Sequence, residues 1–217
     1  MRDTVAVAED VRVTQEVLEA GPQAPRRGIP AAAVWALGIG ALVILTVANV
    51  LAITDFAART IEADALITAV ERSEASMMAT QEEFATVMAT VDRESLTDQE
   101  REALRTELTE LAQKSQASIG LAGIGVADVS VLPWHTSITN ARDVYLEHNS
   151  AWVDYMAAAA VDPAEWFRPQ AAVNDTFADA RVPLIEAVPL VDVLQTLARI
   201  ELIYVSGSGD SGSEQAA

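Results

Sequence analysis

The chain has 217 residues, 51% of them hydrophobic, and a formal net charge of −18, which is enough for one domain of ordinary size beside a membrane segment. It contains no cysteine, so disulfide scaffolds, thiolate metal sites and Cys/His catalysis are excluded. Residues 54–217 hold 27 acidic and ten basic residues. A surface this acidic repels nucleic acid, and we expect no nucleic-acid partner.

The first predicted element is a transmembrane helix over residues 30–53. No charged residue occurs from Gly28 to Thr54, and Ala31 to Ile53 supplies 23 residues, where a span needs about 20. A secretory signal has a shorter apolar core close to the N-terminus. We therefore expect a retained signal-anchor, although the residues around Leu51 resemble a cleavage site. Residues 1–29 are predicted to be a disordered tail.

The basic residues predict the orientation of this span. Arg26 and Arg27 lie just before it, whereas acidic residues such as Asp55 and Glu62 follow it. The positive-inside rule then places the N-terminus in the cytoplasm and residues 54–217 outside the plasma membrane, in a single-pass protein. One lysine against 13 arginines, with abundant alanine, is a bias typical of GC-rich bacterial genomes.

A stripe of small residues runs along the predicted span. Ala32, Ala36 and Gly40 are spaced at i, i+4 and i+8, and small residues on one stripe let two membrane helices approach closely. This is a candidate helix-packing stripe for a homodimer. The alternative interpretation is that alanine is simply common in this chain.

Beyond the span, apolar residues recur at the spacing of an α-helix. A row of mostly apolar residues, spaced alternately by four and three positions, runs from Phe56 to Val91. We call such a row a seam, and it is typical of a helix packed lengthwise on others. Thr97 and Glu100 form a capping box that opens a second helix. We expect this helix to end at the glycines of GLAGIG, at positions 120–125, and an apolar connector to follow.

A third seam starts after Pro133 and comprises Trp134, Ile138, Ala141, Tyr145, His148, Trp152, Tyr155 and Ala159. Asp162 and Pro163 open a short turn. A fourth helix is predicted over 170–187, interrupted or kinked at Pro183, and a last helix after Pro189. The pattern predicts an all-α fold in which an up-and-down bundle of four to five helices fills residues 54–205. The Gly/Ser-rich residues 206–217 are predicted to be a disordered tail.

This layout is similar to the extracytoplasmic four-helix sensor modules of bacterial chemoreceptors, in which a membrane helix continues into a bundle. The similarity is one of layout alone, because no motif accompanies it. The 217 residues show neither a second span nor a cytoplasmic signalling part. We assign no family on this basis.

Little in the sequence indicates catalysis or metal binding. A carboxylate di-metal site in a bundle needs Glu-x-x-His motifs, and this chain has two histidines and no such motif. Asp143 and Glu147 are spaced for one helix face, but the third seam places them outward. No nucleophile elbow or phosphate loop is found. We expect no cofactor, no metal and no enzymatic activity.

The one candidate site consists of a few polar residues that occupy positions on the otherwise apolar seams. It comprises Glu74 and Gln81 on the first seam and His148 on the third, with the aromatic residues Tyr145, Trp152 and Tyr155 around them. One interpretation is an aromatic ligand pocket. The other is a packed core in which His148 is buried and hydrogen-bonded to Gln81 or Glu74, fixing the register of the helices.

Together these features favour a membrane-anchored extracytoplasmic bundle that acts through protein–protein contact, as an accessory or scaffold of the bacterial cell envelope. The alternative is a sensor-like module that binds a small molecule between its helices. A hydrolase is the third option. A cavity of about 300 Å³ or more beside His148 would favour the ligand-binding alternative.

Overall fold

A computed structural model describes residues 30–91, 96–189 and 193–207, and these are all-helical, with no strand among them. The two predicted disordered tails lie largely or wholly outside the described residues. The chain divides into two compact units, residues 1–48 and 49–217.

Helix α1 (Ala31–Ala89) is a single helix of 59 residues. The apolar segment and the first predicted seam thus belong to one continuous helix. Among the described helices, α1 is the one long and apolar enough to cross a membrane, and its most apolar window is not buried by other residues. A fully exposed apolar helix in water is unfavourable, which is the physical basis for a span.

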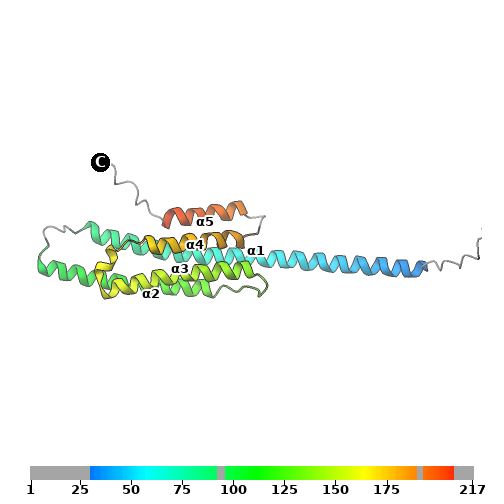
Figure 1. The fold of residues 1–217 in the computed structure, drawn as a ribbon, viewed down its shortest axis with the longest axis horizontal. Helices are drawn as coiled ribbons and strands as arrows, with labels where there is room; N and C mark the ends of the chain where they lie inside the picture. Colours follow the sequence, from blue (N-terminus) through cyan, green and yellow to red (C-terminus); the bar gives the residue numbers. More distant parts are fainter. Residues whose placement is uncertain (1–29, 92–95, 190–192, 208–217) are drawn as a thin grey trace, which may run out of the picture. The chain divides into compact units, whose positions relative to one another are not determined.

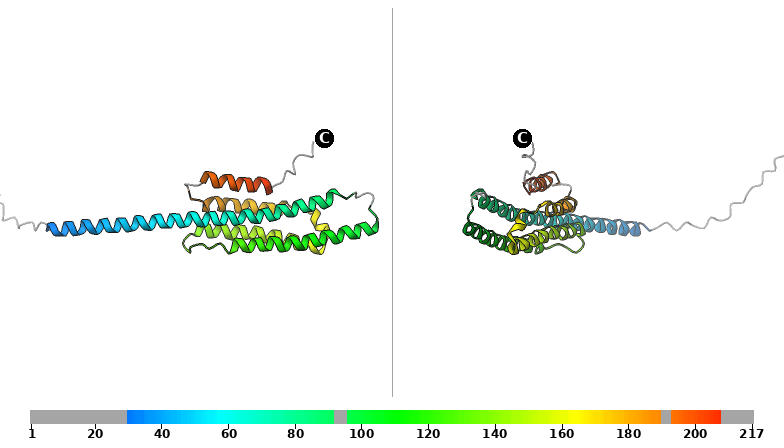
Figure 2. Two further views of the ribbon diagram at one scale, coloured as in Figure 1. Left: turned by 180° about the vertical axis from the view of Figure 1, so that it is seen from behind. Right: turned by 60° about the vertical axis from the view of Figure 1, so that its left-hand side comes forward.

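The second unit contains the rest of α1 followed by α2 (Asp98–Ala127), α3 (Thr136–Val161), the short 3₁₀ helix η1 (Pro163–Phe167), α4 (Ala171–Ala187) and α5 (Val193–Gly207). The successive helices of this unit run in alternating directions, as Figures 1 and 2 show. The predicted up-and-down helical bundle is confirmed. The capping box of Thr97 and Glu100 is present at the start of α2.

The core of this unit consists of two hydrophobic clusters. One includes Leu66, Val70, Tyr145, Leu184 and Ile200, and the other includes Met77, Ile119, Trp152, Met156 and Trp166. On both α1 and α3 the clusters are separated by two adjacent buried polar residues. These four residues, which we call the polar layer, are Ser73, Glu74, His148 and Asn149.

One helix boundary differs from the prediction. α2 does not end at Gly120 but continues to Ala127. A glycine within a helix costs only about 1 kcal/mol, and the buried Ile119 and Val126 keep this segment packed. The fourth helix has nearly the predicted bounds, and Pro183 lies inside it without interrupting it. Proline has no N–H to donate to the carbonyl four residues earlier, so α4 lacks one backbone hydrogen bond there.

The third seam is wrong at its first residue. Trp134 precedes α3, which begins at Thr136, and its side chain is 63% exposed. The neighbouring His135 is buried instead. Farther along α3 the seam is confirmed, because Ile138, Ala141, Tyr145, His148, Trp152, Tyr155 and Ala159 are all buried.

Candidate functional site

The expected burial of His148 is confirmed. Its side chain is 1% exposed and that of Trp152 is 2% exposed. The ring lies between Tyr145 of α3 and Phe177 of α4, with centroid distances of 5.7 and 5.2 Å. His148 is therefore part of the core and not a surface histidine.

The hydrogen bonds around His148 determine which ring nitrogen carries a proton. The hydroxyl of Thr176 donates to the backbone carbonyl of Val173, at 2.5 Å. It therefore accepts from Nδ1 of His148, 2.8 Å away, and Nδ1 must be protonated. This arrangement directs Nε2 toward α1.

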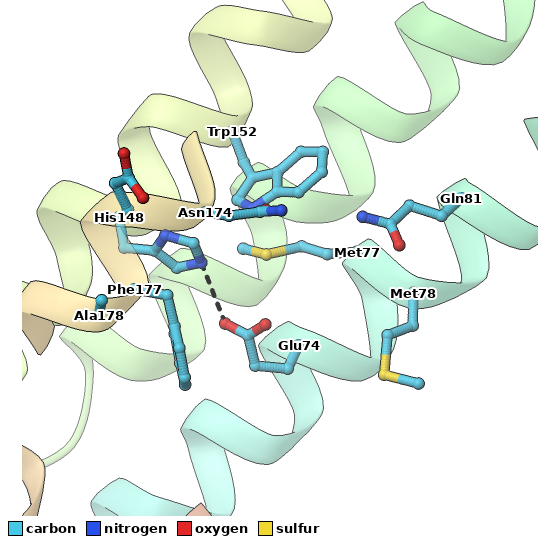
Figure 3. Close-up of a pocket in the computed structure, with 10 residues that line it drawn as sticks. Glu74, Met77, Met78, Gln81, His148, Trp152, Asn174, Phe177 and Ala178 are labelled. Carbon is cyan, nitrogen blue, oxygen red and sulfur yellow. Dashed lines mark ion pairs between the residues drawn. The ribbon is translucent and has the colours of Figure 1, made fainter. Parts of the chain in front are cut away.

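Nε2 of His148 faces the carboxylate of Glu74, with 3.3 Å between Nε2 and Oε1 (Figure 3). The distance is that of an ion pair, but the two groups are not hydrogen-bonded, and Nε2 has no hydrogen-bond partner among the residues that the structure describes. Both side chains are buried. Because burial removes both groups from water, each depends on the other and on its hydrogen-bonded neighbours for stabilisation.

Tyr145 completes this side of the polar layer. Its hydroxyl donates to Oε1 of Glu74 at 2.8 Å. Burial raises the pKa of Tyr145 well above its usual value of 10, and the nearby Glu74 charge raises it further. The phenol therefore remains protonated and continues to donate to the carboxylate.

Asn149 forms the other side of the polar layer. Its amide nitrogen donates to the Ser73 hydroxyl and to the Ile119 carbonyl, each at 3.1 Å. One side chain thus joins α1, α2 and α3. Because a buried amide is stable only when it is hydrogen-bonded, these contacts fix the relative register of the three helices.

A small cavity adjoins the polar layer. It has a volume of about 90 Å³ and is lined by residues that include Glu74, Met77, His148, Trp152 and Asn174, several of which are seen in Figure 3. Pockets that bind small molecules usually measure about 300–1,000 Å³. A cavity of this size and polarity is suited to a few water molecules.

The remaining candidate residues do not all meet at this cavity. Gln81 lines it, but its amide donates to Gln170 at 3.4 Å and not to His148. The Tyr155 hydroxyl donates to the carbonyl of Trp166 at 3.1 Å, beyond the cavity. The predicted hydrogen bond from His148 to Gln81 or Glu74 is therefore wrong, because the ring bonds to Thr176 of α4, and Glu74 faces Nε2 only at ion-pair distance. The stripe of Ala32, Ala36 and Gly40 is exposed on α1, and a dimer through it stays a prediction.

A second polar cluster was not predicted. It comprises Asp55 and Glu62 of α1 and Trp134 and His135 of the α2–α3 connection, and we call it the junction. Nδ1 of His135 lies 2.6 Å from Oε2 of Glu62, and Nε2 lies 3.3 Å from Oδ1 of Asp55. Both ring nitrogens of a buried histidine thus face carboxylates.

The rest of the junction is held by neutral donors. Nε1 of Trp134 donates to Oδ1 of Asp55 at 2.7 Å, and the backbone N–H of Leu132 donates to Glu62 at 3.2 Å. The hydrogen bond that His135 donates to Glu62 raises the pKa of His135 above 6.5, with burial opposing this shift and Asp55 adding to it. The bonds from Trp134 and His135 lower the pKa of Asp55. Each shift favours the charged form.

Within the described ranges, no three His, Asp or Glu side chains are arranged to hold a metal ion. Within the polar layer, and likewise within the junction, the polar side chains are directed at other groups of the same cluster. This arrangement is typical of structural ion pairs. No family model matches the chain, and neither a curated protein nor a solved structure matches it significantly.

Proposed function

We propose that this protein is a single-pass membrane protein whose extracytoplasmic helical bundle acts through protein–protein contact, as a non-catalytic accessory or scaffold of the bacterial cell envelope. The observation that supports this proposal best is the small volume of the cavity beside the polar layer. The cavity beside His148 has about 90 Å³, well below the volume of a typical ligand site.

The polar groups of the core support a structural role over a catalytic one. Active sites bring together ionisable groups in a cleft whose pKa values are strongly perturbed. At the junction, the pKa of His135 is raised chiefly by Glu62 and that of Asp55 is lowered chiefly by Trp134, so each shift results from a direct contact and favours the charged form. This is how a structural ion pair behaves.

The membrane anchor is supported by the apolar part of α1 and by the paired arginines before it. Alkaline phosphatase fused after residue 207 tests the topology, because the enzyme is active only outside the cytoplasm. We expect activity in a membrane fraction that resists carbonate extraction. Activity in a soluble product that begins near Ile53 would instead show that the segment is a cleaved signal.

Photo-cross-linking in cells separates protein contact from ligand binding. A photo-reactive amino acid placed in turn at Leu121, Val182 and Leu202, which are exposed on three different helices, should give a discrete protein adduct from at least one position. Glu107, also exposed on α2, is the charged control. If no position gives an adduct, and a small molecule copurifies and is lost on Trp152→Ala substitution, the ligand-binding alternative is correct.

A further inference from the structure

We propose that Trp134 inserts into the interfacial layer of the lipid bilayer, so that the α2–α3 connection is a second membrane contact of the bundle. This inference rests on the proposed membrane span. The proposed binding partner is the headgroup region of a fluid lipid bilayer, and the group that contacts it is the indole ring of Trp134. The argument depends on the depth at which Trp134 is held.

The position of Trp134 is fixed relative to the end of the span. Its indole N–H donates to Asp55 at 2.7 Å, and Asp55 is the first charged residue after the uncharged run that ends at Thr54. At a rise of about 1.5 Å per residue, Asp55 lies only about 3 Å beyond Ile53. If the apolar run fills the hydrocarbon layer, the indole lies at its boundary.

The surroundings of Trp134 are those of an interfacial residue. Its side chain is 63% exposed, and it shares a surface groove with Leu51, Ala52 and Leu132. Leu51 and Ala52 belong to the last turns of the predicted span. The indole thus has its polar N–H bonded to a protein group, while its apolar body remains uncovered beside residues that would be immersed in lipid.

Tryptophan is enriched at membrane–water interfaces because its ring is largely apolar and carries one polar group. The acidic bundle would repel anionic headgroups. A contact through a neutral indole avoids this repulsion and predicts binding to zwitterionic lipid.

The junction holds the connection rigidly at this depth. His135 is buried between Asp55 and Glu62, and the Leu132 backbone N–H donates to Glu62. The residues on both sides of Trp134 are therefore fastened to α1. A ring that is already positioned loses little conformational freedom on insertion.

Quenching of tryptophan fluorescence by brominated lipids tests this inference with the full-length chain in phosphatidylcholine vesicles. Bromine near the headgroup should quench Trp134, and bromine deep in the acyl chains should quench Trp35, which is located within the span. In a Trp35→Phe background we expect shallow bromine to quench strongly. The further substitution Trp134→Phe should remove most of that quenching, because Trp152 and Trp166 are buried.

A matched control uses the exposed Phe167 of η1. Phe167→Trp in the Trp35→Phe, Trp134→Phe background should give emission that shallow bromine does not reduce. Equal shallow quenching with and without Trp134 would overturn the inference. Protection of Trp134 from acrylamide that depends on the protein-to-lipid ratio, without bromine quenching, would assign the ring to a second copy of the chain and overturn it as well.

The same measurement separates failure of this inference from failure of the proposed function. If deep bromine does not quench Trp35 in the wild-type chain, the segment does not span the bilayer, and the membrane anchor itself is wrong. If deep bromine quenches Trp35 while shallow bromine does not reach Trp134, the anchor stands and only the interfacial contact of the bundle is refuted.

Discussion

Gly123 of α2 and Asn149 of α3 approach so closely that a Cβ atom added to Gly123 would lie 2.2 Å from Oδ1 of Asn149. The Asn149 side chain cannot simply move away, because its amide is bonded to Ser73 and to the Ile119 carbonyl. The absence of a side chain at position 123 therefore allows one amide to join three helices.

Gly123→Ala should destabilise the bundle, by about 1–3 kcal/mol, since overpacking a filled core has a cost of this size. Gly120 and Gly125 lie on the same helix and have nothing within 4 Å of an added Cβ. Alanine there should stabilise by up to about 1 kcal/mol through helix propensity. Urea unfolding should show a lower free energy of unfolding for Gly123→Ala and an unchanged or higher one for the alanine variants at Gly120 and Gly125. A stabilising Gly123→Ala would contradict the close contact with Asn149.

The pairing of His148 with Glu74 predicts a non-additive pair of substitutions. His148→Leu leaves Glu74 buried without its facing ring, and breaking a buried pair on one side typically costs about 3–5 kcal/mol. The double variant with Glu74→Gln should be more stable than His148→Leu alone, because no buried carboxylate remains. A double-mutant cycle by urea unfolding measures this coupling.

Two comparisons make the cycle specific. Gln81→Leu should cost much less than His148→Leu, because Gln81 is only partly buried and bonds to Gln170. If the effects of the two single substitutions on the free energy of unfolding instead add up to that of the double variant within about 0.5 kcal/mol, His148 and Glu74 are not coupled. In that case this pair does not contribute to stability.

Helix type and order could be predicted from the sequence because the relevant signals are local. The spacing of apolar residues from Ala63 to Met77 and from Ile138 to Ala159 defines buried faces, and the capping box at Thr97 marks a helix start. The end of α2 was not predictable in this way. The segment is kept in the bundle by its buried Ile119 and Val126 and by the contact of Gly123 with Asn149, which lies 26 residues farther along the chain.

The candidate site was only partly predictable for the same reason. The seams placed His148 in the core and limited its partner to α1, but Thr176 of α4 lies 28 residues away and follows no seam rule. The junction joins Asp55 and His135 across 80 residues of sequence. No periodic pattern links such positions, and the exposed Trp134 coincided with the expected spacing by chance.

Arg199 provides the attachment of α5 to α1. Its guanidinium donates to both oxygens of Glu71 at 2.7 Å, to Asp64 at 2.6 Å and to Thr68 at 3.1 Å. These bonds raise the pKa of Arg199 above its ordinary value. Arg199→Lys keeps the charge but loses the planar fork. Because the pair is partly exposed, we expect a loss of only about 1 kcal/mol.

Hydrogen exchange is the appropriate measurement for this variant, because the effect is local. Amides of α5 should exchange faster in Arg199→Lys and faster still in Arg199→Gln, while those of α3 remain unchanged. The salt pair of Arg101 and Asp98, which is exposed on α2, supplies the control, and Arg101→Gln should leave α5 unaffected. Uniform acceleration across the whole bundle would show that Arg199 acts on global stability.

The junction predicts a pH dependence of stability whose sign follows from two pKa shifts. The pKa of His135 is raised above 6.5, chiefly by Glu62, so its contribution is complete below about pH 6.5 and is lost as pH rises through the folded-state value. The pKa of Asp55 is lowered from 3.8, chiefly by Trp134. Its contribution is present above about pH 4 and is lost as pH falls further.

His135→Gln should therefore cost most stability between about pH 4 and pH 6.5, where a charge-assisted hydrogen bond is worth about 1.5–3 kcal/mol, and least near pH 9. Urea unfolding of the full chain in detergent micelles at pH 5.5, 7.5 and 9 measures this difference. Glu62→Gln should flatten the dependence, because it removes the larger cause of the shift. Trp134→Phe, which leaves both contacts of His135 intact, should preserve it. A cost of His135→Gln that is the same at all three pH values would mean that the ring stabilises the junction by packing and not by its charge.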